Sequence, residues 1–407
     1  MSGRRSPPAD PAEAHAADQP DRWRAQLDAL HWLWTPLLAF FVSRLGIALV
    51  AFIAEPLMAD SNIPPYHLRP DNVLLDVFGS RWDTGFYLSI AEEGYFYQGV
   101  ELPSVAFFPL LPLLMRAVRT VTGDALIAGL IIANLTLLGA AVLFYRLVSE
   151  SWSGPVAARA VWFLLIFPTS FFGSAIYSES LFLLCATGAL YLFRRGYWES
   201  AALLGVLGAL SRLMGILIAP LLLVEWWSQR RDRPSATRPS WAALLAPLAV
   251  PLGTGAYMLY QQRAFGDPLA FVQASAAWER APNAPWATVS ALFQRPASGW
   301  WAALQAGQLP LNEWLDLLFV LFFLVLGVIL LVQRRWSEGI FVLLGALLPL
   351  SSGLLLSQRR YMWVLFPAYA LLAQWGENPR VERAIFVLFS MGLALFTALF
   401  ANWYWVA

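Results

Sequence analysis

A short acidic stretch in the first quarter of the sequence carries the side chains best suited to chemistry. It opens with Trp82 and Asp83 and closes with Gly94. Asp is favoured just before a helix and Gly just after one, so the spacing predicts a helix that begins at Asp83 and ends at Gly94. Asp83 and Tyr87 share one face of that helix, and Glu92 lies on the opposite face. Asp83 could accept a proton from an attacking hydroxyl, or it could simply cap the helix.

Three arginines are candidates for binding an anion such as a leaving phosphate. A guanidinium is planar, permanently charged and able to bind phosphate through two hydrogen bonds. Arg212 interrupts a long apolar run, where a charge usually faces a cavity or a partner. Arg359 and Arg360 stand together before another apolar run. The simpler alternatives are a snorkelling side chain for Arg212 and lipid headgroup binding for the other two.

Further polar and aromatic residues are expected to line the same site. Glu179 stands beside Tyr177 near the start of an apolar run, where it could orient Arg212, contact an acceptor sugar, or favour a helix N-terminus. The residues predicted to line the site or contact an acceptor are Trp82, Tyr87, Glu92, Glu93, Tyr177, Glu179 and Tyr361.

The sequence predicts no metal site and no disulfide. The single cysteine is Cys185, and the histidines are scattered along the chain, at His15, His31 and His67. The acidic residues of the first stretch could bind a divalent cation only if that stretch were not helical. We therefore expect no obligatory cofactor.

The elements that position these residues are predicted to be membrane helices. Of the 407 residues, 59% are hydrophobic and 13% are charged, against about 25% charged in an ordinary domain. The apolar residues form long runs, whereas a β-barrel would show alternation. This composition excludes a soluble enzyme, a disordered chain and a disulfide-rich module. The net charge of +1 provides no field for nucleic acid, and nothing in the sequence sets an oligomeric state.

We predict an all-α polytopic membrane protein with about eleven spans. Residues 1–30 are polar and read as a disordered cytoplasmic tail, followed by one membrane domain over residues 31–407. The run 107–118 is too short to span. Treating it as non-spanning puts the N-terminus and the Arg-rich turns in the cytoplasm and the C-terminus outside. Those turns carry Arg146, Arg159, Arg194, Arg195, Arg230, Arg231, Arg233, Arg238, Arg334, Arg335, Arg380 and Arg383.

Two long segments then lie on the outer side, at about residues 54–124 and 261–312. Loops of this length usually carry function in a compact protein. The first contains the acidic stretch described above, so we expect the chemistry on the outer face.

Several motifs, in the same order, resemble the PIG-V family of GPI mannosyltransferase II-like proteins and their bacterial relatives, a branch of the GT-C glycosyltransferases. Together they cover the chain from the first span to about Gln374, while the second outer loop and the last span match no motif of the family. The motifs are Trp82-Asp83, Phe107-Phe108-Pro109-Leu110-Leu111-Pro112, Phe167-Pro168-Thr169-Ser170-Phe171-Phe172 with Tyr177-Ser178-Glu179-Ser180, Ser211-Arg212-Leu213-Met214-Gly215, and Arg360-Tyr361 with Phe366-Pro367.

The resemblance implies a GT-C type helix bundle with a large first outer loop. It also implies a glycosyltransferase that moves a hexose, mannose in this family, from a polyprenyl-phosphate donor to a lipid-linked or cell-envelope acceptor. The reaction would take place on the outer face of a bacterial plasma membrane, with Asp83 as the base. Phosphate leaves readily, so one carboxylate suffices where glycoside hydrolases need two. This single-base logic leads us to expect inversion at the anomeric carbon.

Two alternatives remain open at this stage. A transporter or lipid flippase would have the same apolar content, although such proteins are often built from repeated halves, which this sequence lacks. A polymerase or ligase of cell-surface polysaccharide would favour a large loop late in the chain.

Overall fold

The computed structural model describes residues 30–61, 70–100, 102–294, 299–306 and 310–406. The described chain is mostly helical and contains no strand in these ranges. The predicted N-terminal tail lies outside the described residues, apart from Leu30. The prediction of an all-α polytopic membrane protein is confirmed.

Within the described ranges, five helical segments are long and apolar enough to cross a bilayer. They carry large exposed apolar side chains, such as Leu45 on the first and Leu388 on the last, which suits a lipid-facing surface. The five are α2 (His31–Leu57), α6 (Ala125–Ser151), the segment Trp241–Phe265, α16 (Leu311–Val332) and α20 (Pro379–Ala401).

The other predicted spans are shorter helices that are interrupted where the sequence carries Pro or a charge. The backbone of Arg212 is extended and separates α9 (Trp198–Ser211) from η3 (Leu213–Leu217) and α10 (Ile218–Asp232). Pro367 opens α19 (Pro367–Trp375) directly after α18 (Gln358–Trp363). The remaining elements of this group are α7 (Gly154–Leu165), η2 (Ser170–Gly173), α8 (Glu179–Arg194) and α17 (Trp336–Leu350). The long segment Trp241–Phe265 is itself built from η5 (Trp241–Leu244), α11 (Leu245–Ala249) and α12 (Pro251–Phe265), and η4 (Ser235–Thr237) lies in the turn before it.

Both segments predicted as outer loops fold largely into short helices. The run 107–118 falls mostly within α5 (Leu110–Thr122), a 13-residue helix and thus about 20 Å long, short of a bilayer's hydrocarbon core of about 30 Å. The first segment also holds α3 (Val73–Gly79), α4 (Thr84–Glu92) and η1 (Ser104–Ala106). The second holds α13 (Ala270–Ala274), η6 (Ser275–Trp278), α14 (Pro285–Gln294) and α15 (Trp300–Gln305).

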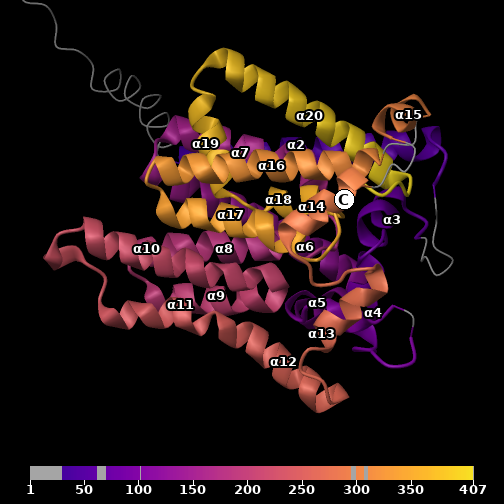
Figure 1. Ribbon diagram of the computed structural model, residues 1–407, viewed down its shortest axis with the longest axis horizontal. Coiled ribbons are helices and arrows are strands. Elements are labelled where there is room, and N and C mark those ends of the chain that lie inside the picture. Colours follow the sequence, from indigo (N-terminus) through magenta and orange to yellow (C-terminus); the bar gives the residue numbers. More distant parts are fainter. Residues whose placement is uncertain (1–29, 62–69, 101, 295–298, 307–309, 407) are drawn as a thin grey trace, which may run out of the picture.

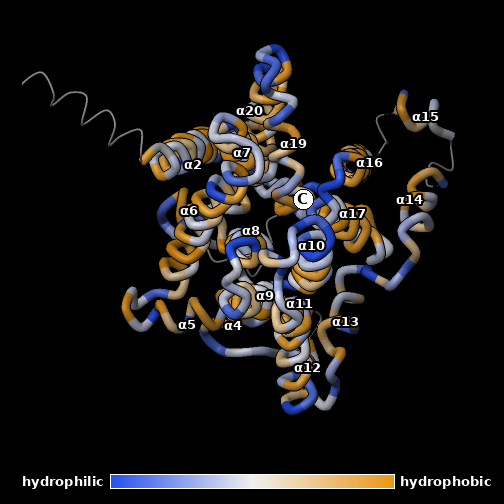
Figure 2. The backbone as a smooth tube through the Cα atoms, turned by 90° about the vertical axis from the view of Figure 1, so that its left-hand side faces the viewer, coloured by the Kyte–Doolittle hydropathy of each residue, from blue (hydrophilic) through white to orange (hydrophobic). Residues whose placement is uncertain are grey.

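Helix α8 lies at the centre of the bundle. It packs against α6, α9 and α10, while α17 packs against α16 and α10 (Figure 1). These helices run roughly side by side, and the short helices α3, α4, α5 and α13 gather at one end of them, near the C-terminus (Figure 1). An end-on view shows apolar residues along most of the long helices (Figure 2). The short helices and the C-terminal segment thus come together at one end of the bundle.

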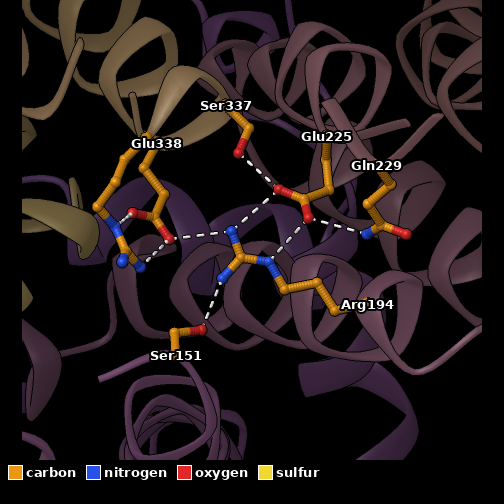
Figure 3. A network of polar contacts seen from close by, with 7 residues as sticks. Ser151, Arg194, Glu225, Gln229, Ser337 and Glu338 are labelled. Carbon is orange, nitrogen blue, oxygen red and sulfur yellow. Dashed lines mark hydrogen bonds and ion pairs between the residues drawn. The ribbon is translucent and has the colours of Figure 1, made fainter. Parts of the chain in front are cut away.

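A buried ion-pair network connects α8, α10 and α17 at the C-terminal end of α8 (Figure 3). Arg194 donates to Glu225 Oε1 and Oε2 at 3.0 and 2.9 Å, and to Glu338 Oε1 at 2.9 Å. Ser337 Oγ donates to Glu225, and Arg335 binds the Glu338 carboxylate. Since α8 has 16 residues, this network lies about 22 Å from the residue that starts the helix, Glu179.

Candidate functional site

The turn before α4 holds Asp83 in place. Trp82 adopts a left-handed backbone, with φ of 55°, which is unusual for a bulky residue and marks a constrained turn. Tyr177 fixes this turn, since its hydroxyl donates to the Arg81 carbonyl and accepts from the Asp83 N–H, both at 3.3 Å. As predicted, Asp83 precedes α4, and Gly94 follows it with φ of 99°.

The side chain of Asp83 does not cap its helix. It makes no hydrogen bond to the first turn of α4. Its Oδ2 instead accepts from Nη1 of Arg360 at 2.7 Å. The reading of Asp83 as a cap alone is therefore wrong, and the carboxylate is committed to a charged partner across the fold.

Four charged side chains form an alternating chain around Asp83. Arg360 contacts Asp83 and also lies 3.1 Å from Glu179 Oε1 through its Nε. Arg212 lies 2.9 Å from the same Glu179 oxygen through its Nη1. The side chain of Glu179 is 2% exposed, so this carboxylate is almost fully removed from solvent. Glu179 thus pairs with Arg212 and also lies at the start of α8.

The other residues of the Tyr-Ser-Glu-Ser motif also have partners in this region. The Tyr87 hydroxyl hydrogen-bonds with Ser178 Oγ at 3.2 Å, and Ser180 Oγ donates to the Gly173 carbonyl at 3.0 Å. Burial, followed by the charges of Glu179 and Asp83, raises the pKa of Tyr87. Its hydroxyl therefore keeps its proton at ordinary pH and remains available as a hydrogen-bond donor.

These side chains line a cavity of about 1050 Å³. The cluster around Asp83 forms a charged part of its lining, and a group of aromatic rings forms another part, called the aromatic wall below. In that aromatic wall Phe86 stacks on Phe107 at 4.6 Å between ring centroids, with Trp278 edge-on to both. A cavity of this size, with a few convergent polar groups and apolar surroundings, is typical of a ligand site.

All the predicted site residues except Arg359 line this cavity. Glu92 and Glu93 line the cavity at exposed positions. Although the predicted helix put Glu92 on the opposite face from Asp83, both residues line the same cavity. Arg359 is fully buried elsewhere: its Nε donates to Asp316 at 2.8 Å and its Nη2 to Asn312 at 3.3 Å. Neither a phosphate nor a lipid headgroup can reach a guanidinium buried in this way.

Sequence reasoning missed residues that come from the second outer segment and from the C-terminus. Arg280 lines the cavity and donates from Nη1 to the Tyr361 hydroxyl at 3.2 Å. Trp403 and Trp405 line it as well and pack edge-on against Trp82. Neither region contains a recognisable motif, and only the high tryptophan content of the last residues offered a signal.

Among the described residues, no group of three or more His, Cys, Asp or Glu side chains is arranged to hold a metal ion. Around Asp83, the charged residues that line the cavity instead form carboxylate–guanidinium pairs. Such pairs can exchange partners with a charged substrate, and a carboxylate among them can take up a proton.

Two of the solved structures that are similar to this chain come from an archaeon. The chain is similar to the oligosaccharyltransferase of Archaeoglobus fulgidus with Zn and sulfate, at 13% identity and a TM-score of 0.42, over 90% of this chain and 53% of that one. It is also similar to AglB of that organism in complex with an inhibitory peptide and a dolichol-phosphate, at 12% identity and a TM-score of 0.43, over 92% and 56%. The chain therefore spans about half the length of these proteins.

No curated protein matches the sequence. A family model does: residues 70–226 match the mannosyltransferase (PIG-V) family. That range contains Asp83, Tyr177, Glu179 and Arg212, and with them four of the five motifs that carried the resemblance. The residues of the candidate site from Asp83 to Arg212 thus lie in a segment of the chain that is similar to the mannosyltransferase (PIG-V) family.

Proposed function

We propose that this protein transfers a hexose, most simply mannose, from a polyprenyl-phosphate donor to a lipid-linked or cell-envelope acceptor. The single observation that carries the proposal is the placement of Asp83 in the wall of the cavity, 2.7 Å from Arg360 and within the family-matched residues. A carboxylate beside a guanidinium offers a proton acceptor next to a site for an anion.

In the proposed reaction the acceptor hydroxyl attacks the anomeric carbon of the donor sugar. Its proton passes to the Asp83 carboxylate, and a new C–O bond forms. The bond between the anomeric carbon and the phosphate oxygen breaks, and its electron pair leaves with polyprenyl phosphate. Attack opposite the leaving group inverts the anomeric configuration.

The contact between Asp83 and Arg360 has a consequence for this step. While Arg360 holds the carboxylate, Oδ2 of Asp83 is occupied by a hydrogen bond from that guanidinium. We propose that donor phosphate draws Arg360 towards itself and loosens this contact, so that the Asp83 carboxylate becomes available to the acceptor hydroxyl when the donor is bound. Arg212 and Arg360 are the predicted phosphate ligands retained here; Arg359, buried against Asp316, is not.

The aromatic wall of Phe86, Phe107 and Trp278 is the proposed surface for the apolar donor chain. Trp82 and Tyr87 are proposed to contact the sugar or the acceptor. We further propose a GT-C type bundle of about eleven helical passes, with this cavity on the outer face of a bacterial plasma membrane and the N-terminus inside. No cation or other cofactor is needed for the proposed step.

The function can be tested with purified protein in proteoliposomes. Radiolabelled polyprenyl-phosphate-mannose, the glucose and galactose analogues, and membrane lipid extracts as acceptors are supplied together. We expect time-dependent transfer of label from one donor to a lipid or glycan product. Movement of intact donor across the bilayer without cleavage would contradict the proposal and favour the flippase alternative.

A further inference from the structure

Three arginines gather around the ring of Tyr361. The guanidinium carbons of Arg212, Arg280 and Arg360 lie 5.2, 5.9 and 5.4 Å from the centroid of that ring. They come from three separate parts of the chain: the start of η3, the second outer segment and α18. All three line the cavity described above.

These three cations are not equally neutralised. Arg212 and Arg360 share Glu179, and Arg360 also contacts Asp83. Arg280 donates to the neutral Tyr361 hydroxyl, and no carboxylate of the described residues lies within ion-pair distance of it. Within this cluster two carboxylates therefore pair with Arg212 and Arg360, and the guanidinium without a carboxylate partner is that of Arg280. Glu92 and Glu93 also line the cavity, at exposed positions outside the cluster.

An excess charge in a partly closed cavity costs free energy unless an anion compensates for it. Arg280 is half-buried, and Tyr361 supports its side chain through one hydrogen bond and one ring contact. A guanidinium held in this way keeps other donor hydrogens free to bind a phosphate.

We propose that Arg280 is the residue of this cavity that recognises the anionic group of the substrate, and that this group is the phosphodiester of the lipid-linked donor. The proposal rests on the function proposed above. A sugar phosphodiester carries one negative charge, which can pair with the guanidinium of Arg280. Arg212 and Arg360 border the same site, so the phosphate lies close enough to Arg360 to compete with Asp83 for it.

The lipid product of the proposed reaction is also an anion. Polyprenyl phosphate is a monoester and carries about 1.5 to 2 negative charges at neutral pH. It is therefore bound more tightly than the donor by the same arginines. Arg280 is expected to set both the KM for the donor and the inhibition by this product.

The test compares Arg280→Gln, Arg280→Lys and Arg263→Gln with the wild type. Arg263 is an exposed arginine at the end of α12 that does not line the cavity, so it is the matched control. A lost hydrogen bond to a charged group corresponds to about a tenfold or larger change in affinity. For Arg280→Gln we expect the donor KM and the inhibition constant of polyprenyl phosphate to rise about tenfold or more, with kcat within about threefold. Arg280→Lys should recover part of the affinity, and Arg263→Gln should match the wild type.

Direct binding of radiolabelled polyprenyl phosphate to the solubilised protein gives a second readout that does not depend on transfer. If the wild type binds this lipid but transfers no sugar, the proposed function fails while the role of Arg280 is still measured. Unchanged binding and KM in Arg280→Gln would overturn the inference. Equal competition by phosphatidylglycerol vesicles would also overturn it, since Arg280 would then bind any lipid phosphate.

Discussion

At the scale of single residues, the site depends on charges that neutralise one another. Glu179 is the central member, because one of its oxygens faces both Arg212 and Arg360. Its side chain is 2% exposed, so water cannot replace it as a partner. Two guanidinium groups would lose their shared counterion if this carboxylate were removed.

We therefore expect Glu179→Gln to destabilise the protein by about 3–5 kcal/mol, the usual cost of breaking a buried ion pair from one side. Denaturant or thermal unfolding in detergent would measure this loss. The control is Glu382→Gln, because Glu382 is 44% exposed and lies 3.9 Å from Arg159. That change should cost about 1 kcal/mol or less. Equal stability of the two variants would mean that the pairs around Glu179 contribute little to folding.

At the scale of elements, Arg212 is positioned by the close packing of η3 on α9. A Cβ atom at Gly215 would lie 1.9 Å from the carbonyl oxygen of Gly208 and 2.6 Å from the Cα of Ala209. These are backbone atoms that no side-chain rotation can move away. The glycine of the Ser-Arg-x-x-Gly motif is thus required because the backbone of η3 crosses α9 at this point.

We predict that Gly215→Ala forces η3 away from α9, displaces Arg212 and lowers transfer activity. The stability should fall by about 1–3 kcal/mol, the usual cost of overpacking. Gly255→Ala is the matched control, since no atom lies within 4 Å of a Cβ built there. That control should be neutral or slightly stabilising, because Ala favours a helix more than Gly does. Full activity in Gly215→Ala, at unchanged stability, would contradict this account of the motif.

The elements also show what the sequence could predict and what it could not. The helix after Asp83 and the interruption at Arg212 followed from local signals: a cap residue, a glycine and a charge within an apolar run. The buried position of Arg359 could not be predicted from such local signals, because neighbouring residues on a helix point about 100° apart. Arg360 therefore faces the cavity while Arg359 faces Asp316. Arg280 was missed because its position depends on how a segment without motifs folds against Tyr361.

At the scale of the whole molecule, the two ends of α8 serve different purposes. Glu179 begins the helix at the cavity, and Arg194 ends it in the network with Glu225 and Glu338. The second cluster has no cavity residue among its members. Its effect should therefore be on stability alone.

We predict that Arg194→Met destabilises the protein by about 3–5 kcal/mol, since it leaves the buried Glu225 carboxylate without a cation and removes one of the two cations that pair with Glu338. The activity per folded molecule should stay near that of the wild type. The neighbouring change Arg195→Met provides the control, because Arg195 and Glu150 are 47% and 37% exposed. Unfolding curves combined with transfer rates would separate the two effects. A large loss of kcat in folded Arg194→Met would show that the two ends of α8 are coupled.

The orientation in the membrane gives a second prediction at this scale. The positive-inside rule places Val100 outside and Ser235 inside. With the buried Cys185 replaced by alanine, Val100→Cys should react with a membrane-impermeant maleimide in intact cells. Ser235→Cys should react only after the membrane is permeabilised. The opposite pattern would place the cavity on the cytoplasmic side.

The central claim, that Asp83 accepts the proton of the acceptor, is tested most directly by the transfer rate of Asp83→Asn at saturating donor. The matched control is Asp71→Asn, the same change at an exposed residue of the same segment that does not line the cavity. A general base contributes about 10²–10⁴-fold to a rate. We predict a fall in kcat of that size for Asp83→Asn, with binding of the donor retained, and a wild-type rate for Asp71→Asn. A folded Asp83→Asn variant with the wild-type kcat would contradict the claim.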